Sequence, residues 1–350
     1  MHIDRKLRKL GIEADIALKL IKYRFTRRPV PLISHLLVTN RCNLKCFYCY
    51  PQVLTRKIPD SALEGWLRNI DTLYALGCRV FILLGGEPLL RDDIGQIIKH
   101  CKTKRVIVEL ITNGYFVEKR IEDLKLVDSL CFSLDGNEEQ NDKTRGKGSF
   151  QKVFQAIQIA KAEQITCRLH AVITRETVCS IRELCELAKE WRVTINFTQA
   201  TIHTDDPKAK LSEGEMQDFL ANLALLKKQG YPIANTYSAI RYIQQYPLPR
   251  YGIYSDHDIP TGKKGAITRC LRPLMTVYID ANGMMYPCAN VWQKCDNSVT
   301  QTSIEEAWRK QCGMDCYSCD ILGEAEMNNM LNFKVTSVLE TAKYNLLKQP

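Results

Sequence analysis

Strand-like and helix-like segments alternate along the chain as far as about residue 229. Apolar runs predict strands at 32–39, 79–84, 105–111, 128–134, 166–173 and 193–199. Apolar residues at helical spacing predict helices at 60–76, 92–103, 117–126, 149–164, 177–191 and 212–229. Strands joined in series by helices form a parallel sheet with right-handed crossovers. Six such units are too few to close an eight-stranded barrel, so the sequence predicts an α/β fold built on a partial (β/α)6 barrel.

Three cysteines follow the first predicted strand in one short loop. Cys42, Cys46 and Cys49 have the spacing C-x3-C-x2-C. Their thiolates can hold three irons of a cubane [4Fe–4S] cluster, which leaves the fourth iron open, whereas a ferredoxin normally gives each cluster four cysteines. Something else is therefore expected to bind the open iron. A zinc loop is the alternative, but zinc sites usually close four ligands, and no fourth ligand lies near this loop in the sequence.

This loop, with Tyr48 just before its last cysteine, resembles the signature of the radical S-adenosylmethionine (SAM) enzymes. The resemblance implies that the amino and carboxylate groups of SAM chelate the open iron. It also implies that one electron from the cluster cleaves SAM into methionine and a 5′-deoxyadenosyl radical, which takes a hydrogen atom from a substrate. In such enzymes the cofactor carries the chemistry, and the protein supplies ligation, orientation and exclusion of water.

A second motif follows the second predicted strand. Gly85-Gly86-Glu87-Pro88 matches the family's Gly-Gly-Glu-Pro motif, and the resemblance implies that Gly85, Gly86, Glu87 and Pro88 bind the SAM amino group. Glycines at a strand end let the backbone approach a ligand closely. The tetrapeptide alone could be an ordinary turn, but it lies one strand–helix unit after the cysteine loop.

Further polar residues lie at later strand ends, where ligands bind in parallel sheets. By position in the family, Asn113, Ser133 and Asp135 are candidate SAM contacts, and Arg145 lies in a segment that resembles one found after the fourth strand of these enzymes. Each could equally belong to an ordinary turn or a solvated loop. Relatives often have asparagine after the fifth strand, and Thr174-Arg175 stands there in this chain.

A second group of cysteines begins at Cys270. The pattern C-x12-G-x4-C, with a predicted hairpin turn at Asn282-Gly283, resembles the opening of the SPASM and twitch domains that carry auxiliary iron–sulfur clusters. The cysteine run of a full SPASM domain is absent, so the resemblance implies the one-cluster twitch form. Its ligands would be Cys270, Cys288, Cys316 and Cys319, with Cys312 and Cys295 as alternates. Zinc held by the same thiolates remains the alternative.

These motifs divide the chain into five parts. They are a basic segment at 1–31, the barrel at 32–230, a connection at 231–267, the auxiliary domain at 268–322 and a terminal helix at 323–350. The chain has 15 cysteines and neither a signal peptide nor a long apolar run. Because a chain that is not exported keeps its thiols reduced, a cytoplasmic location and metal-bound cysteines are expected.

The amino-terminal segment is strongly basic. Residues 1–30 hold nine Lys and Arg against three Asp and Glu, out of a net charge of +10 for the whole chain. Apolar residues lie between the basic ones, which predicts an amphipathic helix or helix pair. Such a helix can lie on an anionic membrane surface, or it can flank the barrel and show a solvated basic face. The sequence favours the second interpretation, and it contains no recognisable nucleic-acid-binding module.

Four functions fit these motifs. The first is a radical SAM enzyme that carries out an oxidation or rearrangement with one auxiliary cluster and takes its electron from a donor such as flavodoxin or ferredoxin. The others are a peptide maturase that crosslinks or epimerises its substrate, an enzyme that modifies a lipid, and a non-catalytic iron–sulfur scaffold. The intact cysteine loop and Gly85 to Glu87 argue against the scaffold. The sequence does not identify the substrate.

Overall fold

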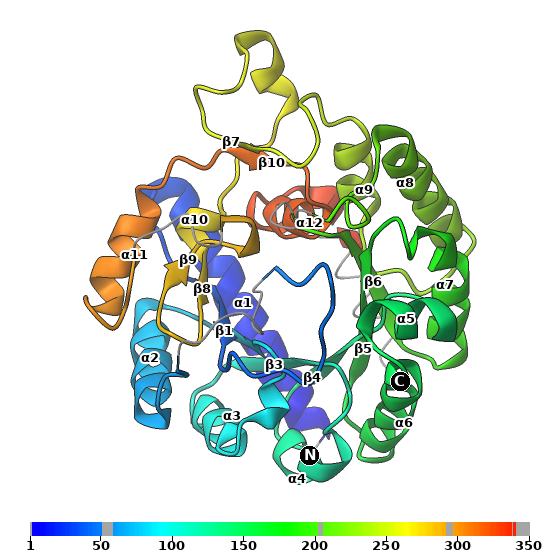
Figure 1. Cartoon of the computed structure of the whole chain (residues 1–350). Helices are drawn as coiled ribbons and strands as arrows, with labels where there is room; N and C mark the ends of the chain where they lie inside the picture. The colour runs from blue at the N-terminus through cyan, green and yellow to red at the C-terminus, as the bar shows by residue number, and fades with distance from the viewer. Residues whose placement is uncertain (1, 51–58, 202–205, 292–296, 338, 341–350) are drawn as a thin grey trace.

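An eight-stranded sheet forms the centre of the molecule (Figure 1). The structure is a computed structural model that describes residues 2–50, 59–201, 206–291, 297–337 and 339–340. The strands of the sheet are β1 Ile33–Leu37, β2 Val80–Leu84, β3 Ile107–Thr112, β4 Ser129–Ser133, β5 Cys167–Ile173, β6 Thr194–Gln199, β8 Thr276–Ile279 and β9 Met285–Tyr286. Their order is β6-β5-β4-β3-β2-β1-β8-β9, and a small separate sheet pairs β7 Ile253–Tyr254 with β10 Ser318–Cys319.

Helices cover the outer face of this sheet (Figure 1). The α-helices are α1 His2–Thr26, α2 Leu63–Leu76, α3 Ile94–Thr103, α4 Ile121–Leu124, α5 Glu138–Arg145, α6 Ser149–Ala162, α7 Ile181–Glu190, α8 Glu213–Lys228, α9 Tyr237–Gln244, α10 Arg272–Met275, α11 Ile304–Cys312 and α12 Leu322–Leu331. Short 3-10 helices are η1 Pro88–Leu90, η2 Glu118–Arg120, η3 Val178–Ser180, η4 Thr261–Ala266 and η5 Ala289–Val291.

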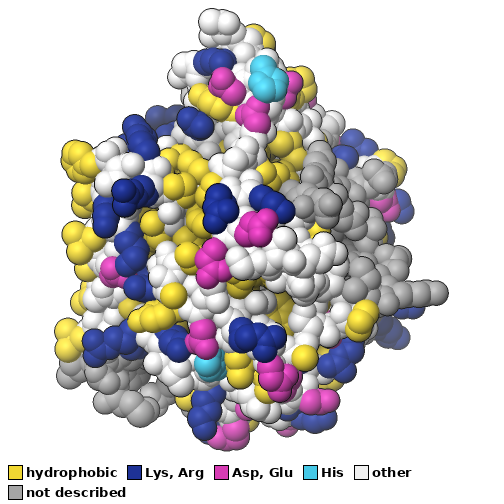
Figure 2. Space-filling model, turned by 90° about the vertical axis from the view of Figure 1, so that its left-hand side faces the viewer, with side chains coloured by type: hydrophobic (Ala, Val, Ile, Leu, Met, Phe, Trp, Pro, Cys, Tyr) yellow, Lys and Arg dark blue, Asp and Glu magenta, His cyan; other side chains and the backbone are white. Residues whose placement is uncertain are grey.

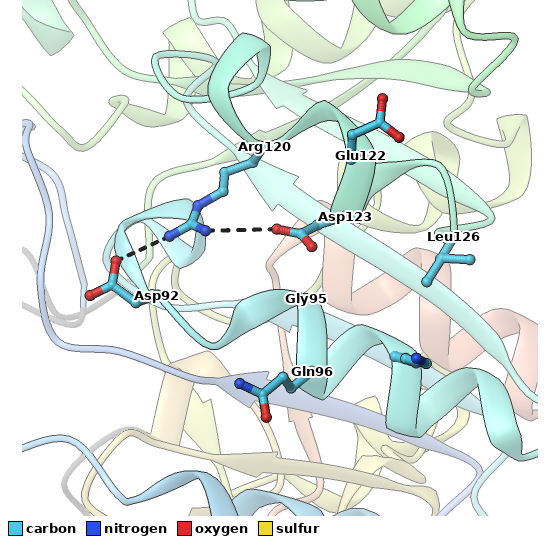
Figure 3. Close-up of a pocket in the computed structure, with 8 residues that line it drawn as sticks. Asp92, Gly95, Gln96, Arg120, Glu122, Asp123 and Leu126 are labelled. Atoms are coloured by element: carbon cyan, nitrogen blue, oxygen red, sulfur yellow. Dashed lines mark hydrogen bonds and ion pairs between the residues drawn. The ribbon is translucent and has the colours of Figure 1, made fainter.

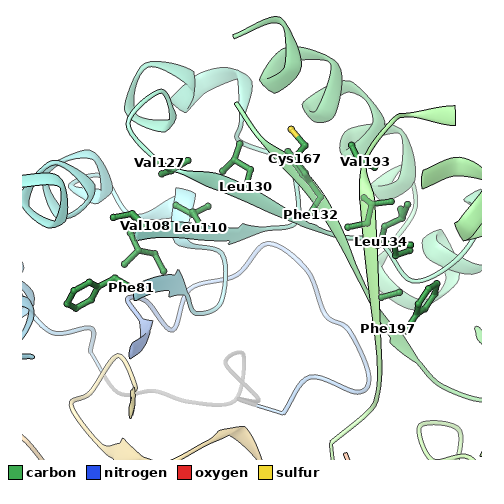
Figure 4. Packing of buried hydrophobic residues seen from close by; sticks show 14 of the residues in the cluster. Phe81, Val108, Leu110, Val127, Leu130, Phe132, Leu134, Cys167, Val193 and Phe197 are labelled. Atoms are coloured by element: carbon green, nitrogen blue, oxygen red, sulfur yellow. The ribbon is translucent and has the colours of Figure 1, made fainter. Parts of the chain in front are cut away.

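The main core lies between the sheet and its helices. Val108 and Leu110 of β3 are fully buried there beside Leu130 and Phe132 of β4 (Figure 4). Because successive side chains of a strand point to opposite faces, the residues between them face the interior of the barrel. Glu109 is one of these, and it forms an ion pair with Arg168 of β5. The core is therefore apolar toward the helices, and the barrel interior contains charged groups.

The partial barrel predicted from the alternation is confirmed. The strands β1 to β6 are parallel neighbours in chain order, and each overlaps its predicted range. The helix predicted at 117–126 is shorter than expected, consisting of η2 and α4, and the short helices α5 and α9 were not predicted. The predicted hairpin forms as β8 and β9, and β8 extends the barrel sheet as a parallel neighbour of β1.

Helix α12 lies between the two ends of the open sheet (Figure 1). On one side it contacts β6, where Gln199 donates from Nε2 to the Asp320 carbonyl at 2.6 Å and accepts from the Leu322 amide at 3.0 Å. On the other side, Glu324 of α12 forms an ion pair with Arg272 of α10 at 2.6 Å. The gap that six units leave in the barrel is thus bridged by a carboxy-terminal segment.

Helix α1 packs under the amino ends of the strands. Leu20 and Tyr23 are buried with Leu32, which precedes β1, and Arg8 donates to the Val106 carbonyl just before β3 at 2.6 Å. The expected helix or helix pair is therefore one helix, and it flanks the barrel. In the part of the chain that the structure describes, no helix is both long and apolar enough to cross a bilayer.

The carboxy-terminal helix is interrupted. Helix α12 ends at Leu331, Phe333 adopts a left-handed backbone with φ of 55°, and helical structure resumes at 335–337. A residue other than glycine rarely adopts this conformation, and it ends the helix there. Residues 341–350 of the predicted terminal helix lie outside the described residues.

Candidate active site and second cysteine cluster

The first cysteine loop begins where β1 ends and is held by the side chain of Asp60. The Asp60 carboxylate accepts hydrogen bonds from Thr39 Oγ1 at 2.5 Å and from the Asn40 amide at 2.6 Å. Cys42, Cys46 and Cys49 are free thiols, each partly buried. Burial raises the pKa of Cys42 to about 11, so an added positive charge such as a metal is needed to make it a thiolate at neutral pH.

Gly85 and Gly86 pack against the backbone of that loop. The Gly86 amide donates to the Thr39 carbonyl and the Glu87 amide to the Arg41 carbonyl, each at 2.8 Å. A Cβ atom at Gly85 would lie 2.6 Å from the Thr39 oxygen, and one at Gly86 only 2.1 Å from the Arg41 oxygen. The glycines were predicted to allow close approach to a ligand. In the structure they also bring the β2 turn against the cysteine loop.

The Glu87 carboxylate connects the turn after β2 to the end of β3. It is fully buried and accepts from Thr112 Oγ1 and the Asn113 amide, both at 2.8 Å, and from the Leu89 amide at 3.1 Å. Burial raises its pKa to about 7. Pro88 begins η1 and is buried. Glu87 thus already has three protein donors, which makes it a group that fixes the turn.

Asn113 lies between the same turn and the cysteine loop. Its Nδ2 donates to Oδ1 of Asn43, the residue after Cys42, at 2.9 Å. Its Oδ1 accepts from the Tyr115 amide at 3.2 Å. The residue predicted at the end of β3 therefore lies against the cysteine loop. Ser133 ends β4, in register with His170 of β5.

Three of the predicted SAM contacts form one buried network. Arg145 binds the Asp135 carboxylate through two nitrogens, at 2.6 and 2.9 Å, and Tyr48 donates its hydroxyl to the same carboxylate. The Val172 amide donates to Asp135 at 2.9 Å. The network reaches the cysteine loop through Tyr48, whose ring centroid lies 5.7 Å from the Arg145 guanidinium. Burial raises the pKa of Cys46, and the positive charge of Arg145 opposes that rise. The charges of Asp135 and Arg145 thus balance each other beside Cys46.

The second group of cysteines comes from three separate segments. Cys270 precedes α10 and Cys288 follows β9. Cys316 precedes β10, and Cys319 is its last residue. Cys270 and Cys316 share a hydrogen bond, which lowers the pKa of Cys270 and raises that of Cys316. Burial raises the pKa of Cys319, and negative charge on Cys270 and Cys288 raises it further. These four thiols, far apart in the sequence, therefore lie within electrostatic reach of one another.

Of the two alternate ligands, Cys312 lies apart from this group in the main core. Cys312 ends α11 and packs on the main core, and burial alone raises its pKa to about 12. Cys295 lies outside the described residues.

Buried charges that sequence reasoning missed surround the second group. Arg272 is 3% exposed, pairs with Glu324 and donates to the Tyr278 hydroxyl at 3.3 Å. Tyr278 stacks on His35, with ring centroids 4.0 Å apart. His35 lies in the middle of β1 and is buried. The signals for Arg272 and Glu324 were weak, namely single charges within a few residues of Cys270 and Cys319.

Tyr50 connects the two cysteine groups. It follows Cys49 and packs on a small cluster that contains Leu37 and Cys288. Burial raises its pKa well above the usual range, and negative charge on Tyr278, Cys49 and Cys288 adds to the rise. One side chain therefore lies within electrostatic reach of both sets of thiols.

The donor geometry bears on the kind of metal. Among the described residues, no three Cys, His, Asp or Glu side chains converge as a site for a single metal ion. Around zinc, four sulfurs at 2.3 Å lie only about 4 Å apart. In a [4Fe–4S] cubane each thiolate binds its own iron. The soft thiol donors and the close glycine turn fit an iron–sulfur cluster.

A separate cleft lies on the outer helical layer, between α3 and α4 (Figure 3). Arg120 projects into it and pairs with Asp92 at 3.1 Å and with Asp123 at 3.8 Å. Its cationic group thus already has carboxylate partners, and the cleft contains no cysteine among its lining residues.

Comparison with known families identifies the barrel. Residues 36–188, which run from β1 into α7, match the Radical SAM superfamily. This part of the chain is a radical SAM domain. Members of this superfamily bind a [4Fe–4S] cluster and SAM, and its SPASM-type members carry auxiliary clusters.

Individual relatives agree with this assignment. Fe-coproporphyrin III synthase of Methanosarcina barkeri is 29% identical over 180 residues, which are 50% of this chain and 44% of that protein. GTP 3′,8-cyclase of Aliarcobacter butzleri is 26% identical over 289 residues, which are 77% of this chain and 84% of that protein. The chain thus spans less than half the length of the first radical SAM relative and most of the second.

A solved structure shares the fold. SuiB of Streptococcus suis, bound to SAM, superposes with a TM-score of 0.64 at 17% identity, over 82% of this chain and 68% of that one.

After β5, Thr174 and Arg175 stand where the sequence comparison with the family expects asparagine. Thr174 is fully buried and hydrogen-bonded to Thr177. Arg175 forms an ion pair with Glu215 at 3.0 Å, so both side chains have structural partners.

Proposed function

We propose that this protein reductively cleaves SAM and uses the resulting radical to abstract a hydrogen atom from a substrate. The proposal rests on one observation above all, that three free thiols lie on a loop whose backbone packs against Gly85 and Gly86. Cys42, Cys46 and Cys49 would hold the cluster and leave one iron for SAM. When bound, the cluster supplies the single electron that cleaves SAM to methionine and a 5′-deoxyadenosyl radical.

The remaining residues would bind and orient SAM. The Gly85–Pro88 turn packs against the backbone of the cysteine loop, and its own backbone would bind the SAM amino group. Glu87 would act by fixing that turn and by adding negative charge near the ammonium. We assign Tyr48, Asn113, Ser133, Asp135 and Arg145 to the SAM pocket around it. Because the charges of Asp135 and Arg145 cancel, this ion pair would offer hydrogen-bonding groups to SAM without adding net charge.

We propose further that Cys270, Cys288, Cys316 and Cys319 hold one auxiliary [4Fe–4S] cluster. Four cysteines would ligate all four irons, and a closed cluster suits electron transfer. Such a cluster would supply a nearby acceptor for the electron that a substrate radical loses, which makes an oxidation the favoured reaction. The buried Arg272 would offset the negative charge of four thiolates.

An external reductant and a reducing compartment complete the proposal. Flavodoxin or ferredoxin is the expected class of electron donor. The described cysteines are all free thiols, which agrees with the cytoplasm as the location.

Release of 5′-deoxyadenosine tests the proposal. Anaerobically reconstituted protein given dithionite and SAM should form it slowly without any substrate. A variant with Cys42, Cys46 and Cys49 all changed to alanine should form none, and a variant with Cys316 and Cys319 changed to alanine should still form it. Cys312→Ala is the matched control and should behave as wild type. Fully loaded wild-type protein that never forms 5′-deoxyadenosine would favour the scaffold function.

A further inference from the structure

Helix α1 carries two apolar faces, of which only one is used by the fold. Ile12, Leu20 and Tyr23 are 5–8% exposed and face the barrel. Polar contacts also fix the rotation of the helix about its axis, since Arg8 is bound at Val106 and Arg79 donates to Asp15 at 2.6 Å. The second face therefore cannot turn inward without breaking these contacts.

The second face is a continuous stripe along the outside of α1. It consists of Leu7, Leu10, Ala14, Leu18, Ile21 and Phe25, and we call it the α1 stripe. The large side chains are strongly exposed, from 46% for Ile21 to 84% for Phe25. Steps of three and four residues keep them on one side of a helix. At 1.5 Å per residue the stripe is about 27 Å long.

Basic side chains flank the stripe toward its carboxy-terminal end. Lys22, Arg24, Arg27 and Arg28 are all exposed there. Figure 2 shows hydrophobic side chains that project along the left-hand edge of the molecule among Lys and Arg, the side on which the back of the barrel in Figure 1 lies. The stripe thus forms a projecting ridge bordered by positive charge.

We propose that the α1 stripe binds the surface of an anionic membrane, with α1 parallel to the bilayer plane. An apolar ridge with basic borders is the pattern of an interfacial helix, whose apolar side enters the lipid and whose cations meet the headgroups. A second copy of the chain fits less well, because pairing two identical stripes would bring the basic residues of both copies together. The carboxyl ends of the strands, with both cysteine groups, would then face away from the membrane.

Vesicle sedimentation of the full-length reconstituted protein tests this proposal. Wild type should sediment with vesicles that contain phosphatidylglycerol and phosphatidylcholine, should bind pure phosphatidylcholine roughly tenfold less, and should be released by high salt. A variant with Leu10, Leu18 and Phe25 changed to serine should lose at least about tenfold in binding to the anionic vesicles. Leu225→Ser is the matched control, since Leu225 is 49% exposed on α8, and it should bind as wild type.

A charge-reversal variant gives an independent readout that leaves the apolar residues in place. Lys22→Glu with Arg28→Glu should weaken binding to anionic vesicles and leave the weak binding to neutral ones unchanged. Wild-type protein that ignores anionic vesicles, or a serine variant that binds as well as wild type, would overturn the proposal. The proposal would also be overturned if wild type were a dimer in sedimentation equilibrium and the serine variant a monomer, because the stripe would then be an interface between copies.

Discussion

Gly86 is the residue at which one added methyl group would disturb the proposed first cluster site. Its missing side chain lets the turn after β2 lie against Arg41, within the cysteine loop. The backbone of that loop would have to move to admit a Cβ atom, because the contact would be 2.1 Å. A shift of about 1 Å at a reacting centre can cost about 100-fold in rate.

Gly86→Ala should therefore lower 5′-deoxyadenosine formation about 100-fold and reduce the iron held by the first site. Gly65→Ala is its control, since nothing lies within 4 Å of the added methyl, and alanine in the first turn of α2 should leave activity intact. Iron content and deoxyadenosine are measured on the same preparations. Full activity in the Gly86 variant would show that the close turn does not position the site.

Arg145 offers a second test at the scale of one residue. Its two hydrogen bonds to Asp135 need a planar guanidinium, which lysine lacks although it keeps the charge. Arg145→Lys should weaken SAM binding about tenfold while leaving the iron content unchanged. Arg175→Lys, at the exposed pair with Glu215, should change neither. Equal SAM affinity of wild type and Arg145→Lys, measured by calorimetry, would exclude Arg145 from the pocket.

The sequence indicated the cysteine and glycine motifs but not the buried charges beside the second cysteine group. Cysteine spacing and a glycine pair are local patterns, so the roles of Cys42 and Gly86 could be predicted from adjacent residues in the sequence. Arg272 and Glu324 are 52 positions apart, and their ion pair exists only after the chain has folded. Tyr50 gave no signal of its own, because its position near both cysteine groups depends on long-range packing.

Among the elements, α12 and the β8–β9 hairpin show where local patterns end. The hairpin turn at Asn282-Gly283 was predictable, but the pairing of β8 with β1 joins segments more than two hundred residues apart. Helix α12 was expected as part of a longer helix, and its break near Phe333 follows from a left-handed residue that no local sequence rule marks. The alternation of strands and helices gave the barrel, and tertiary contacts decided what closes its open side.

The carboxylate of Glu326 on α12 makes the docking of that helix depend on pH. It accepts from the amide and hydroxyl of Thr236 at the start of α9, at 2.9 and 3.2 Å, and burial raises its pKa to about 7 from 4.5. The folded state thus holds the proton more tightly than the unfolded state. The stabilisation is complete below about pH 4.5 and is lost as the pH rises toward 7, by about 1–2 kcal/mol for a partly buried group.

Glu326→Gln should remove this dependence, because glutamine does not titrate. The difference in melting temperature between variant and wild type should therefore be more favourable to the variant at pH 8 than at pH 5. Glu64→Gln, exposed in the first turn of α2, should show no such change. An equal difference at both pH values would mean that Glu326 does not titrate between them.

At the scale of the whole molecule, a single barrel brings two groups of cysteines to the region where its open side is bridged. The first group follows β1, and the second comes from segments around β8, β9 and α12 that extend and bridge the barrel. The fold class was predictable because strand and helix periods differ. Which four distant cysteines meet was not predictable from spacing alone, and only the resemblance to known domains suggested them.

Metal analysis of anaerobically reconstituted protein tests the two-cluster account most directly. Wild type should hold about eight irons and eight sulfides per chain, as two [4Fe–4S] clusters require. A variant with Cys42, Cys46 and Cys49 changed to alanine should hold about four, and so should a variant with Cys270, Cys288, Cys316 and Cys319 changed to alanine. Cys312→Ala should keep the wild-type content. Wild type with about four irons and one zinc, whose zinc disappears only in the second variant, would contradict the account.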